Sequence, residues 1–315
     1  MTLAATTTRV LTRGQLRDCV DLPVLAEELR QALTGYDEDA GVAHRLRSRP
    51  HPSVTAMVLA PGLAPGVPAY TVKVHAKNPD RRPAITGVIC LHDLTTGDLL
   101  AVMDSEWLIA VRTGVGAGLG THVLARPGSG DVGVVGAGVQ GRASLRALSS
   151  LRRLSSVHVH DVVPEAAAAF AEEVEGELGV PVQVRSSAAE VAGACDVLLV
   201  ATWGREPVLD ADTVRPGTHV TSLGADEPGK VELAPSLLDL ALVVTDDRRL
   251  ASTVLSRVDT TVGAILRGEH PGRQTDEQVT AYSPVGLPLQ DCVIAWRAHR
   301  RAAARGVGLA VDLGQ

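Results

Sequence analysis

The stretch DVGVVGAGVQGRASLRALSSLRRLSSVHVHD, residues 131–161, decides the fold of the larger part of this chain. An apolar run ends in Gly136-Ala137-Gly138-Val139-Gln140-Gly141, a helical pattern follows, and a second β-rich run ends at Asp161. Strand, glycine-rich turn, helix and strand in this order are typical of the βαβ unit that binds a dinucleotide.

The glycines and the acid each have a physical role in such a unit. Gly136 permits the tight turn, Gly138 leaves room for a pyrophosphate, and Gly141 lets the helix lie close to the strand. The helix N-terminus presents free N–H groups to the phosphates. Asp161, 20 residues after Gly141, would accept hydrogen bonds from the adenosine ribose hydroxyls and repel a 2′-phosphate. Because residues 162–164 include no Arg or Lys, we expect NAD(H) rather than NADP(H).

The composition restricts the class of protein. The chain has 315 residues, 45% hydrophobic and 21% charged, which is typical of a globular protein with one large or two smaller domains. Apolar runs fall short of the ~18 residues of a membrane span, and no secretory signal is evident. A net charge of −6 argues against a nucleic-acid partner. We expect a cytoplasmic protein without membrane or nucleic-acid contacts.

The cysteines and histidines do not indicate a metal centre. The four cysteines are far apart and form no CxxC pair, and the ten histidines show no metal-ligand spacing. We therefore expect reduced thiols and no metal site. The four cysteines are Cys19, Cys90, Cys195 and Cys292.

Strands and helices are expected to alternate through residues 126–286. Continuously apolar strands such as 197–200 are typical of a parallel sheet covered by helices on both faces. We predict an α/β domain with a Rossmann-type doubly wound parallel sheet. The expected strands are 131–135, 156–161, 181–185, 196–201, 218–223 and 242–246, and the expected helices are 139–150, 164–178 and 187–193.

Residues 1–125 show a different pattern, which predicts a smaller α+β substrate-binding and dimerisation domain. Helical patterns at 22–34 and 105–124 flank a series of β-rich runs. A further helical segment, 287–306, follows the nucleotide-binding domain, and we expect the tail 287–315 to return to the first domain. The β-rich runs are 53–59, 68–75, 85–91 and 98–103.

Three charged residues are candidates for catalysis or binding. Lys73 lies in an apolar β run, and Arg112 opens a run of small residues after an apolar segment. Asp226 follows an apolar strand that ends near Gly224, at the carboxyl edge of the expected sheet, where ligands bind. Taken singly, they also fit an edge-strand lysine, a helix-surface arginine and a turn or N-cap acid.

Together with other motifs these residues resemble the ornithine cyclodeaminase/mu-crystallin family over about residues 10–310. The matching motifs are the Arg45 region, Ala60-Pro61-Gly62, Lys73-Val74, Leu100-Ala101-Val102-Met103-Asp104 leading to Arg112-Thr113, Gly136-Ala137-Gly138-Val139-Gln140, Ala201-Thr202, Gly224 to Leu233, and Gly286-Leu287-Pro288-Leu289-Gln290-Asp291.

The resemblance implies roles for these residues. Arg45, Lys73 and Arg112 would clamp the carboxylate of an amino or imino acid and hold its Cα against the nicotinamide C4. Lys73 would also donate or accept a proton, since neighbouring cations lower its pKa. Asp226 would take a proton from the amine or from attacking water and stabilise the cationic iminium.

The glycine motif and the resemblance together also predict the cofactor contacts. Thr113 and Gln140 are expected near the phosphates, and the resemblance implies a homodimer formed through the first domain. The expected cofactor-binding residues are Thr113, Gly136, Gly138, Val139, Gln140, Gly141, Asp161, Ala201, Thr202 and Leu223.

Two departures from the family pattern bear on the substrate. Ornithine cyclodeaminases carry a Glu before a Met-Pro, and the equivalent positions here are Val58 and Ala60. A pocket without that carboxylate accepts a distal ammonium poorly, because a buried charge needs a partner. Gly141 stands where the family often has Ala, which agrees with the general dinucleotide motif. Asp226 argues against a purely binding, crystallin-like role.

The sequence therefore predicts an NAD(H)-dependent oxidoreductase that acts on the C–N bond of a small amino or imino acid, such as an alanine dehydrogenase or an imine reductase. One alternative is an ornithine or lysine cyclodeaminase that releases ammonia with redox-neutral use of NAD. Another is a non-catalytic protein that binds a ligand in a nucleotide-dependent way.

Overall fold

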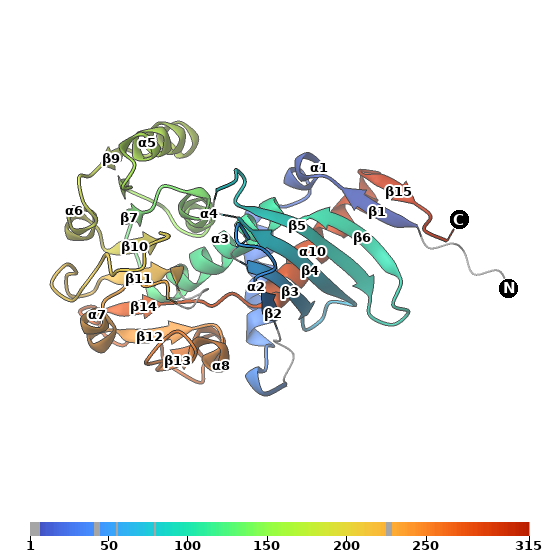
Figure 1. The fold of residues 1–315 in the computed structure, drawn as a ribbon. Helices are drawn as coiled ribbons and strands as arrows, with labels where there is room; N and C mark the ends of the chain where they lie inside the picture. Colours follow the sequence, from blue (N-terminus) through green and yellow to red (C-terminus); the bar gives the residue numbers. More distant parts are fainter. Residues whose placement is uncertain (1–6, 41–44, 55, 79, 225–228, 315) are drawn as a thin grey trace. The chain divides into compact units, whose positions relative to one another are not determined.

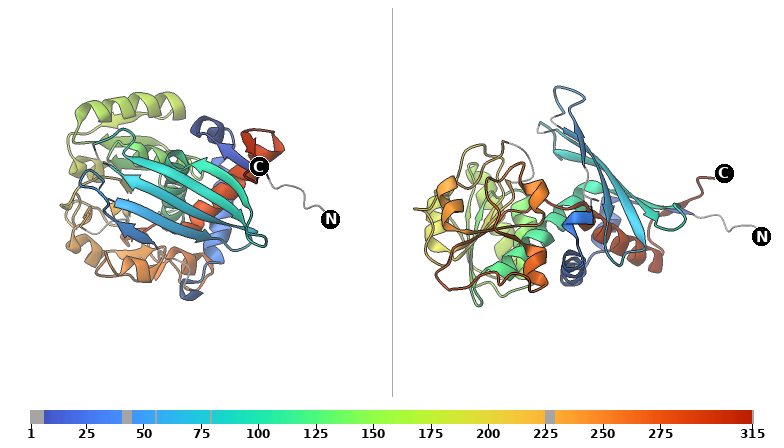
Figure 2. Two further views of the ribbon diagram at one scale, coloured as in Figure 1. Left: turned by 45° about the vertical axis from the view of Figure 1, so that its right-hand side comes forward. Right: turned by 90° about the horizontal axis from the view of Figure 1, so that it is seen from below.

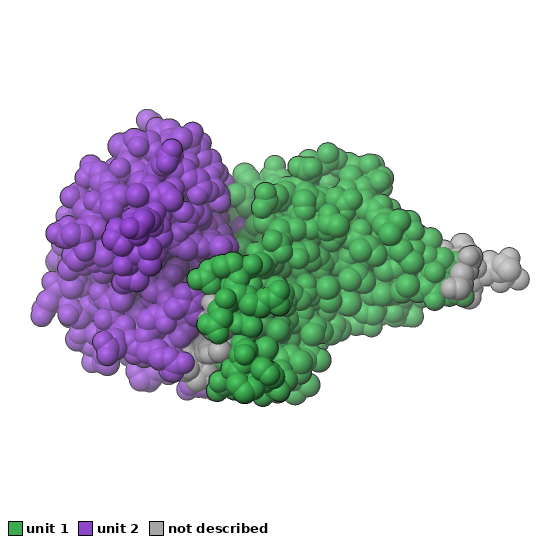
Figure 3. Space-filling model, turned by 45° about the horizontal axis from the view of Figure 1, so that its top comes forward, with its two compact units in different colours: residues 1–112, 287–315 green, residues 113–286 purple. Residues whose placement is uncertain are grey.

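The computed structural model describes residues 7–40, 45–54, 56–78, 80–224 and 229–314. The chain forms two compact units, shown in Figure 3: unit 1 is Met1–Arg112 with Leu287–Gln315, and unit 2 is Thr113–Gly286. The boundary falls inside helix α3 (Ser105–Leu124), whereas the sequence pattern predicts it after residue 125. A helix that runs through a boundary leaves no loop for a sequence pattern to detect.

Unit 2 contains the predicted doubly wound sheet, so the fold class is confirmed (Figure 1). Its eight strands lie in the order β13-β12-β14-β11-β10-β7-β8-β9, and every neighbouring pair is parallel. The strands are β7 (Asp131–Val135), β8 (Ser156–His160), β9 (Val182–Val184), β10 (Val197–Val200), β11 (His219–Ser222), β12 (Leu242–Thr245), β13 (Thr260–Thr261) and β14 (Thr280–Tyr282).

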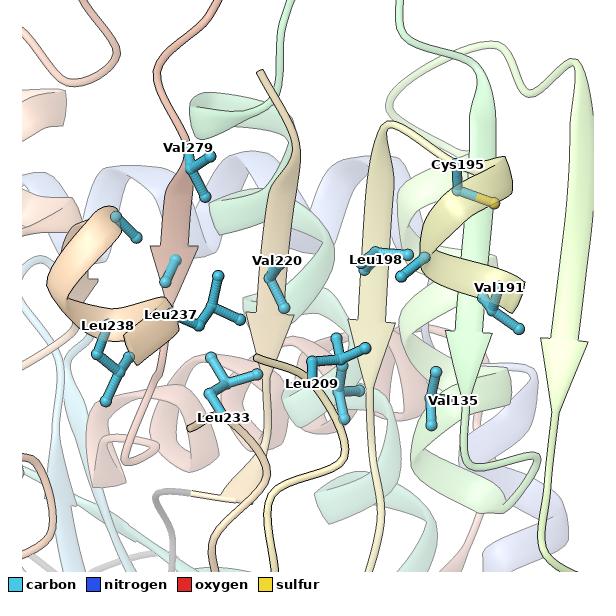
Figure 4. Packing of buried hydrophobic residues seen from close by; sticks show 14 of the residues in the cluster. Val135, Val191, Cys195, Leu198, Leu209, Val220, Leu233, Leu237, Leu238 and Val279 are labelled. Atoms are coloured by element: carbon cyan, nitrogen blue, oxygen red, sulfur yellow. The ribbon is translucent and has the colours of Figure 1, made fainter. Parts of the chain in front are cut away.

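Helices cover both faces of this sheet because successive strand residues point to opposite sides. Leu198 of β10 packs in a cluster with Val191 and Leu237, which belong to helices α6 and α7 (Figure 4). Leu199, the next residue, packs in a second cluster with Leu148 of α4 and Phe170 of α5. The helices are α4 (Val139–Ser149), α5 (Pro164–Leu178), α6 (Ala188–Ala194), α7 (Pro235–Leu240), α8 (Arg248–Ala251) and α9 (Val262–Leu266).

Unit 1 is built on a second sheet with the strand order β15-β1-β6-β5-β4-β3-β2. Its neighbouring strands are antiparallel, except that β1 and β6 are parallel. The strands are β1 (Thr8–Leu11), β2 (Leu46–Ser48), β3 (Ala56–Leu63), β4 (Ala69–Lys77), β5 (Ile85–Asp93), β6 (Leu99–Asp104) and β15 (Leu309–Val311). The helical segments are α1 (Arg13–Arg17), α2 (Leu22–Thr34), the 3-10 turn η1 (Glu38–Ala40) and α10 (Pro288–Ala304).

Helix α10, from the end of the chain, lies across strands β3 to β6, and α2 packs against it (Figure 2). The approach is close at its first turn. A Cβ atom on Gly62 of β3 would collide with the carbonyl oxygen of Pro288. The absence of a side chain at Gly62 therefore brings the first turn of α10, and Asp291 with it, down onto the sheet.

The other face of this sheet carries half-exposed apolar side chains from four neighbouring strands. Among the described residues of unit 1, no helix packs on that face (Figure 2). The residues include Met57, Leu59, Tyr70, Val72, Val74, Val88, Leu100 and Val102. None of the described helices has the length and apolar character needed to span a bilayer.

Candidate functional site

Unit 1 holds a buried ion pair at the centre of its sheet. Lys73 of β4 donates through Nζ to Oδ2 of Asp291 in the first turn of α10. Lys73 is only 4% exposed and Asp291 only 1%. Charges so far from water need partners, since leaving either one unpaired would cost several kcal/mol.

Arg112, at the end of unit 1 in α3, joins the same cluster. Its Nε lies 3.1 Å from Oδ1 of Asp291, and its Nη1 donates a hydrogen bond of 2.8 Å to Oε1 of Gln290. Arg45, which precedes β2, is close enough for its charge to act on both Lys73 and Asp291. Two cations, Lys73 and Arg112, thus contact the one carboxylate of Asp291, and the charge of Arg45 acts on the same pair.

This environment changes the acidity of both partners. Burial, together with the charges of Arg112 and Arg45, lowers the pKa of Lys73 to about 8, although Asp291 opposes the change. Burial alone would raise the pKa of Asp291, but Lys73, Arg112 and Arg45 hold it below its ordinary value. Asp291 is therefore ionised at neutral pH, and the pKa of Lys73 lies close to neutral pH.

The strand register places three more residues on this face. Ala60 of β3 lies directly opposite Lys73 of β4, and Val58 lies opposite His75. Val58, which stands where ornithine cyclodeaminases carry a glutamate, is therefore next to the cluster. His75 is 8% exposed, and its Nδ1 has no hydrogen-bond partner. Burial and the charges of Lys73 and Lys77 lower the pKa of His75 to about 3, so its imidazole is neutral.

Unit 2 contains the predicted glycine turn between β7 and α4. Gly136 has a φ of 100°, and a Cβ there would collide with the carbonyl oxygen of Ala201, so only glycine is suited to this position. Gly138 is the N-cap of α4, and a Cβ on it would meet open space. Since no side chain caps the helix, its N-terminus is open to an anion.

Two polar side chains beside this turn agree with a bound dinucleotide. Asp161, just after β8, accepts hydrogen bonds from the backbone N–H groups of Ala137 at 2.8 Å and Val163 at 2.9 Å. Its carboxylate is thus held at the turn. Oε1 of Gln140, in the first turn of α4, is buried without a partner. These features fit a pyrophosphate at the helix and a ribose at the acid.

The carboxyl ends of β10 and β11 complete this edge of the sheet. The amide of Ala201 donates to Val135 of β7, and that of Leu223 donates to Val200 of β10. Glu232 accepts hydrogen bonds from Thr202 and Ser222 and so connects the two strand ends. Ala201, Thr202 and Leu223 therefore lie at the same edge as the glycine turn.

The structure groups the predicted residues within each unit. Arg45, Lys73 and Arg112 are together in unit 1, whereas Thr113, the first residue of unit 2, begins the other group. Asp226 lies outside the described residues. Within the described ranges, no group of three His, Cys, Asp or Glu side chains is arranged to hold a metal ion. The remaining predicted cofactor residues, Gly136, Gly138, Val139, Gln140, Gly141, Asp161, Ala201, Thr202 and Leu223, all belong to unit 2.

Sequence reasoning did not assign roles to Asp291, Gln290, His75 or Glu232. The Gly-Leu-Pro start of α10 was a usable signal for Asp291, because an acid in the first turn of an otherwise apolar helix face needs a buried partner. Its partner could not be identified, since 218 residues separate it from Lys73.

A chain that combines a doubly wound unit with a dinucleotide-type turn and a second unit with a buried cationic cluster is characteristic of nucleotide-dependent oxidoreductases that act on small acids. The chain matches the ornithine cyclodeaminase/mu-crystallin family over residues 8–306. It belongs to that family.

Characterised relatives cover most of the chain. Alanine dehydrogenase of Archaeoglobus fulgidus is 34% identical over 251 residues, which are 75% of this chain and 77% of that protein. An archaeal alanine dehydrogenase dimer with bound NAD has a TM-score of 0.90 and 28% identity, covering 98% of this chain and 99% of its own. Thermococcus litoralis Δ1-pyrroline-2-carboxylate reductase, in complex with NADH and L-proline, has a TM-score of 0.88 and 29% identity, covering 96% and 100%.

Proposed function

We propose that the protein is an NAD(H)-dependent oxidoreductase that acts on the C–N bond of a small amino or imino acid. The observation that carries this proposal is the buried cluster in which two cations, Lys73 and Arg112, both contact the single carboxylate of Asp291. Two cations on one carboxylate attract a further anion, and a planar guanidinium suits a carboxylate because it can hold both oxygens.

Asp291 prepares this site for its substrate. It contacts both Lys73 and Arg112, so it fixes the two cations relative to each other before a ligand arrives. Gln290 holds the other side of Arg112 at 2.8 Å. A substrate carboxylate held by such a rigid clamp would have its Cα in a defined place, which lowers the entropic cost of the reaction.

Lys73 is the group that we propose to move a proton. Its pKa of about 8 lies near neutrality, so Nζ can donate a proton in one direction of the reaction and accept one in the other. From the family resemblance, we assign Asp226 a second proton-handling role towards the amine or a water molecule. The side chain of Asp226 lies outside the described residues.

We further propose NAD(H) as the cofactor, which supplies or receives the hydride. The N-terminus of α4 and Gly138 would hold its pyrophosphate, Thr113 and Gln140 would lie near the phosphates, and Asp161 would bind the adenosine ribose. Asp161 would repel the additional phosphate of NADP(H), because two anions in close contact destabilise each other. Relatives with bound NAD and NADH support this choice.

The second candidate function is that of a redox-neutral cyclodeaminase, which Val58 disfavours. Val58 is buried opposite the neutral His75, so this part of the site offers no carboxylate to a distal ammonium. We therefore propose an imine reductase or amino-acid dehydrogenase. Ammonia release from ornithine or lysine with catalytic NAD would favour the cyclodeaminase instead.

The open face of the unit 1 sheet supports a homodimer. Its apolar side chains from strands β3 to β6 form a continuous surface, and a monomer that exposed such a surface would tend to associate. The relation to a dimeric alanine dehydrogenase agrees with a second copy of this chain as the partner. Light scattering on the purified protein should give the mass of two chains, and Val72→Glu on this face should reduce it to one.

A substrate screen tests the proposed activity. The protein is mixed with NADH and either cyclic imino acids or 2-oxo acids plus ammonia, and in the reverse direction with NAD⁺ and amino acids. We expect oxidation of NADH with at least one imino or 2-oxo acid and little with NADPH. A folded protein that binds NADH but turns over none of these compounds would contradict the proposal.

A further inference from the structure

Glu232 is a buried acid at the carboxyl edge of the unit 2 sheet, with only 2% of its surface exposed. Its Oε1 accepts hydrogen bonds from the backbone N–H of Thr202 at 2.6 Å and from the Thr202 hydroxyl at 2.9 Å. Its Oε2 accepts one from the hydroxyl of Ser222 at 2.6 Å. One carboxylate thus joins the end of β10 to the end of β11.

The backbone around Glu232 reinforces this connection. Its carbonyl oxygen accepts hydrogen bonds from the amides of Val208 and Leu209, and the adjacent Leu233 packs with Leu209 in the core (Figure 4). Gly224 lies against the side chain, where a Cβ would be 2.9 Å from Cγ of Glu232. The carboxylate is therefore held on one side by the core and on the other by the strand ends.

We propose that Glu232 is a positioning residue for the cofactor: it holds Thr202 and the end of β11 in the geometry that NADH requires, and it acts through hydrogen bonds, not through its charge. This inference rests on the proposed function, because Thr202 and Leu223 are the residues that we expect to contact the cofactor. The glycine turn depends on the same edge, since Gly136 packs against Ala201, the neighbour of Thr202.

The hydrogen-bond pattern allows a role through hydrogen bonds to be distinguished from a role through negative charge. Burial raises the pKa of Glu232 and so disfavours its charged form, while the hydrogen bonds from Ser222 and Thr202 favour it. A glutamine has the same shape: its oxygen can accept both bonds from Thr202, while its amide group donates to the Ser222 hydroxyl, which can also act as an acceptor. Alanine provides none of these bonds.

The experiment compares Glu232→Gln and Glu232→Ala by direct titration with NADH, followed by fluorescence in the absence of any acid substrate. We expect Glu232→Gln to bind NADH within about threefold of the wild type. We expect Glu232→Ala to bind about tenfold more weakly or worse, because it removes all three side-chain hydrogen bonds that hold Thr202 and Ser222. In turnover by Glu232→Ala, the KM for NADH should rise while the KM for the acid substrate stays unchanged.

Two further variants separate positioning from general damage. Asp259→Ala removes a carboxylate that accepts a 2.8 Å bond from Val243 at the opposite edge of the same sheet, and it should leave NADH binding unchanged. Ser222→Ala removes the Oε2 bond, together with a long 3.4 Å bond that the Ser222 hydroxyl accepts from the Gly224 amide, and it should weaken NADH binding about threefold. This smaller change decides the matter if Glu232→Ala does not fold.

The outcomes distinguish this inference from the proposed function. If Glu232→Gln loses NADH affinity as fully as Glu232→Ala, the charge is essential and the positioning role is wrong. If Ser222→Ala and a folded Glu232→Ala both bind NADH like the wild type, Glu232 has no role towards the cofactor. A folded wild-type protein that binds no NADH would instead overturn the proposed function.

Discussion

Lys73 and Asp291 form a buried ion pair between residues that are 218 positions apart, one on a central strand and the other in the first turn of the last helix. The pair links α10, in the C-terminal segment of unit 1, to strand β4 of the same unit. It also sets the charge of the candidate substrate site, because two cations, Lys73 and Arg112, contact this one carboxylate.

Asp291→Asn should shift the pH dependence of the reaction. Asp291 favours the protonated form of Lys73, so its removal should lower the pKa of Lys73 further below about 8. If protonated Lys73 is needed for imine reduction, the alkaline fall in kcat/KM should move to lower pH. The variant should also lose about 3–5 kcal/mol of stability, as expected when one partner of a buried pair is removed. An unchanged pH profile would mean that Lys73 is not the titrating group.

Gly136→Ala and Gly138→Ala should fail in different ways. The Gly136 position has a positive φ and abuts Ala201, so an added methyl group should destabilise the fold by about 1–2 kcal/mol or more. The Gly138 position is open, so Gly138→Ala should keep the melting temperature but weaken NADH binding about tenfold or more, because the methyl group would occupy the pyrophosphate site. Equal NADH affinity for the wild type and Gly138→Ala would place the pyrophosphate elsewhere.

Asp161→Asn should relax the choice of cofactor. Ala137 donates to Oδ2 of Asp161 and Val163 to Oδ1, so Asn can keep only one of these two bonds, and a melting curve should report a small loss of stability at the turn. The loss of negative charge should raise the ratio of kcat/KM with NADPH to that with NADH about tenfold. Steady-state kinetics with both cofactors measure this ratio, and no change in it would show that Asp161 does not face the adenosine ribose.

Val58→Glu should admit substrates with a distal ammonium. The new carboxylate would lie opposite His75 and beside Ala60, within the face that carries Lys73. We expect ammonia release from ornithine with catalytic NAD to rise about tenfold, with some loss of stability from the buried charge. Val58→Gln, of the same length but neutral, is the matched control and should show no gain. A gain in both variants would indicate a change of size, not of charge.

His75 should make the protein sensitive to acid. Its pKa is about 3 in the folded protein and 6.5 ordinarily, so the folded state resists a proton that the unfolded chain binds. The contribution of His75 to the stability of the folded state is therefore complete above pH 6.5, and it is lost as the pH falls from 6.5 towards 3. The loss is about 2 kcal/mol at pH 5. Urea unfolding of His75→Gln should therefore show a smaller loss between pH 7 and pH 5 than the wild type does. Equal losses would mean that His75 is protonated in the folded state.

Local signals in the sequence predicted much of the fold and only part of the candidate site. The glycine turn and Asp161 could be predicted because strand, turn and helix are adjacent in the chain. Strand β14 (Thr280–Tyr282) was not predicted, although it lies between β11 and β12. Asp291 and Glu232 were missed because their partners lie on other elements, 218 residues away for Lys73 and 30 for Thr202, and only the folded chain shows which buried acid meets which donor.

Transfer of hydride from cofactor to substrate carbon is the central claim, and isotope labelling tests it most directly. The protein is incubated with NADH that carries deuterium at both C4 hydrogens of the nicotinamide, and with the imino acid, or the 2-oxo acid plus ammonia, on which it is most active. Mass spectrometry of the amino-acid product should show one deuterium at Cα, and the Lys73→Met variant should form no labelled product. An amino-acid product without deuterium at Cα, or ammonia release with no net consumption of NADH, would contradict the account.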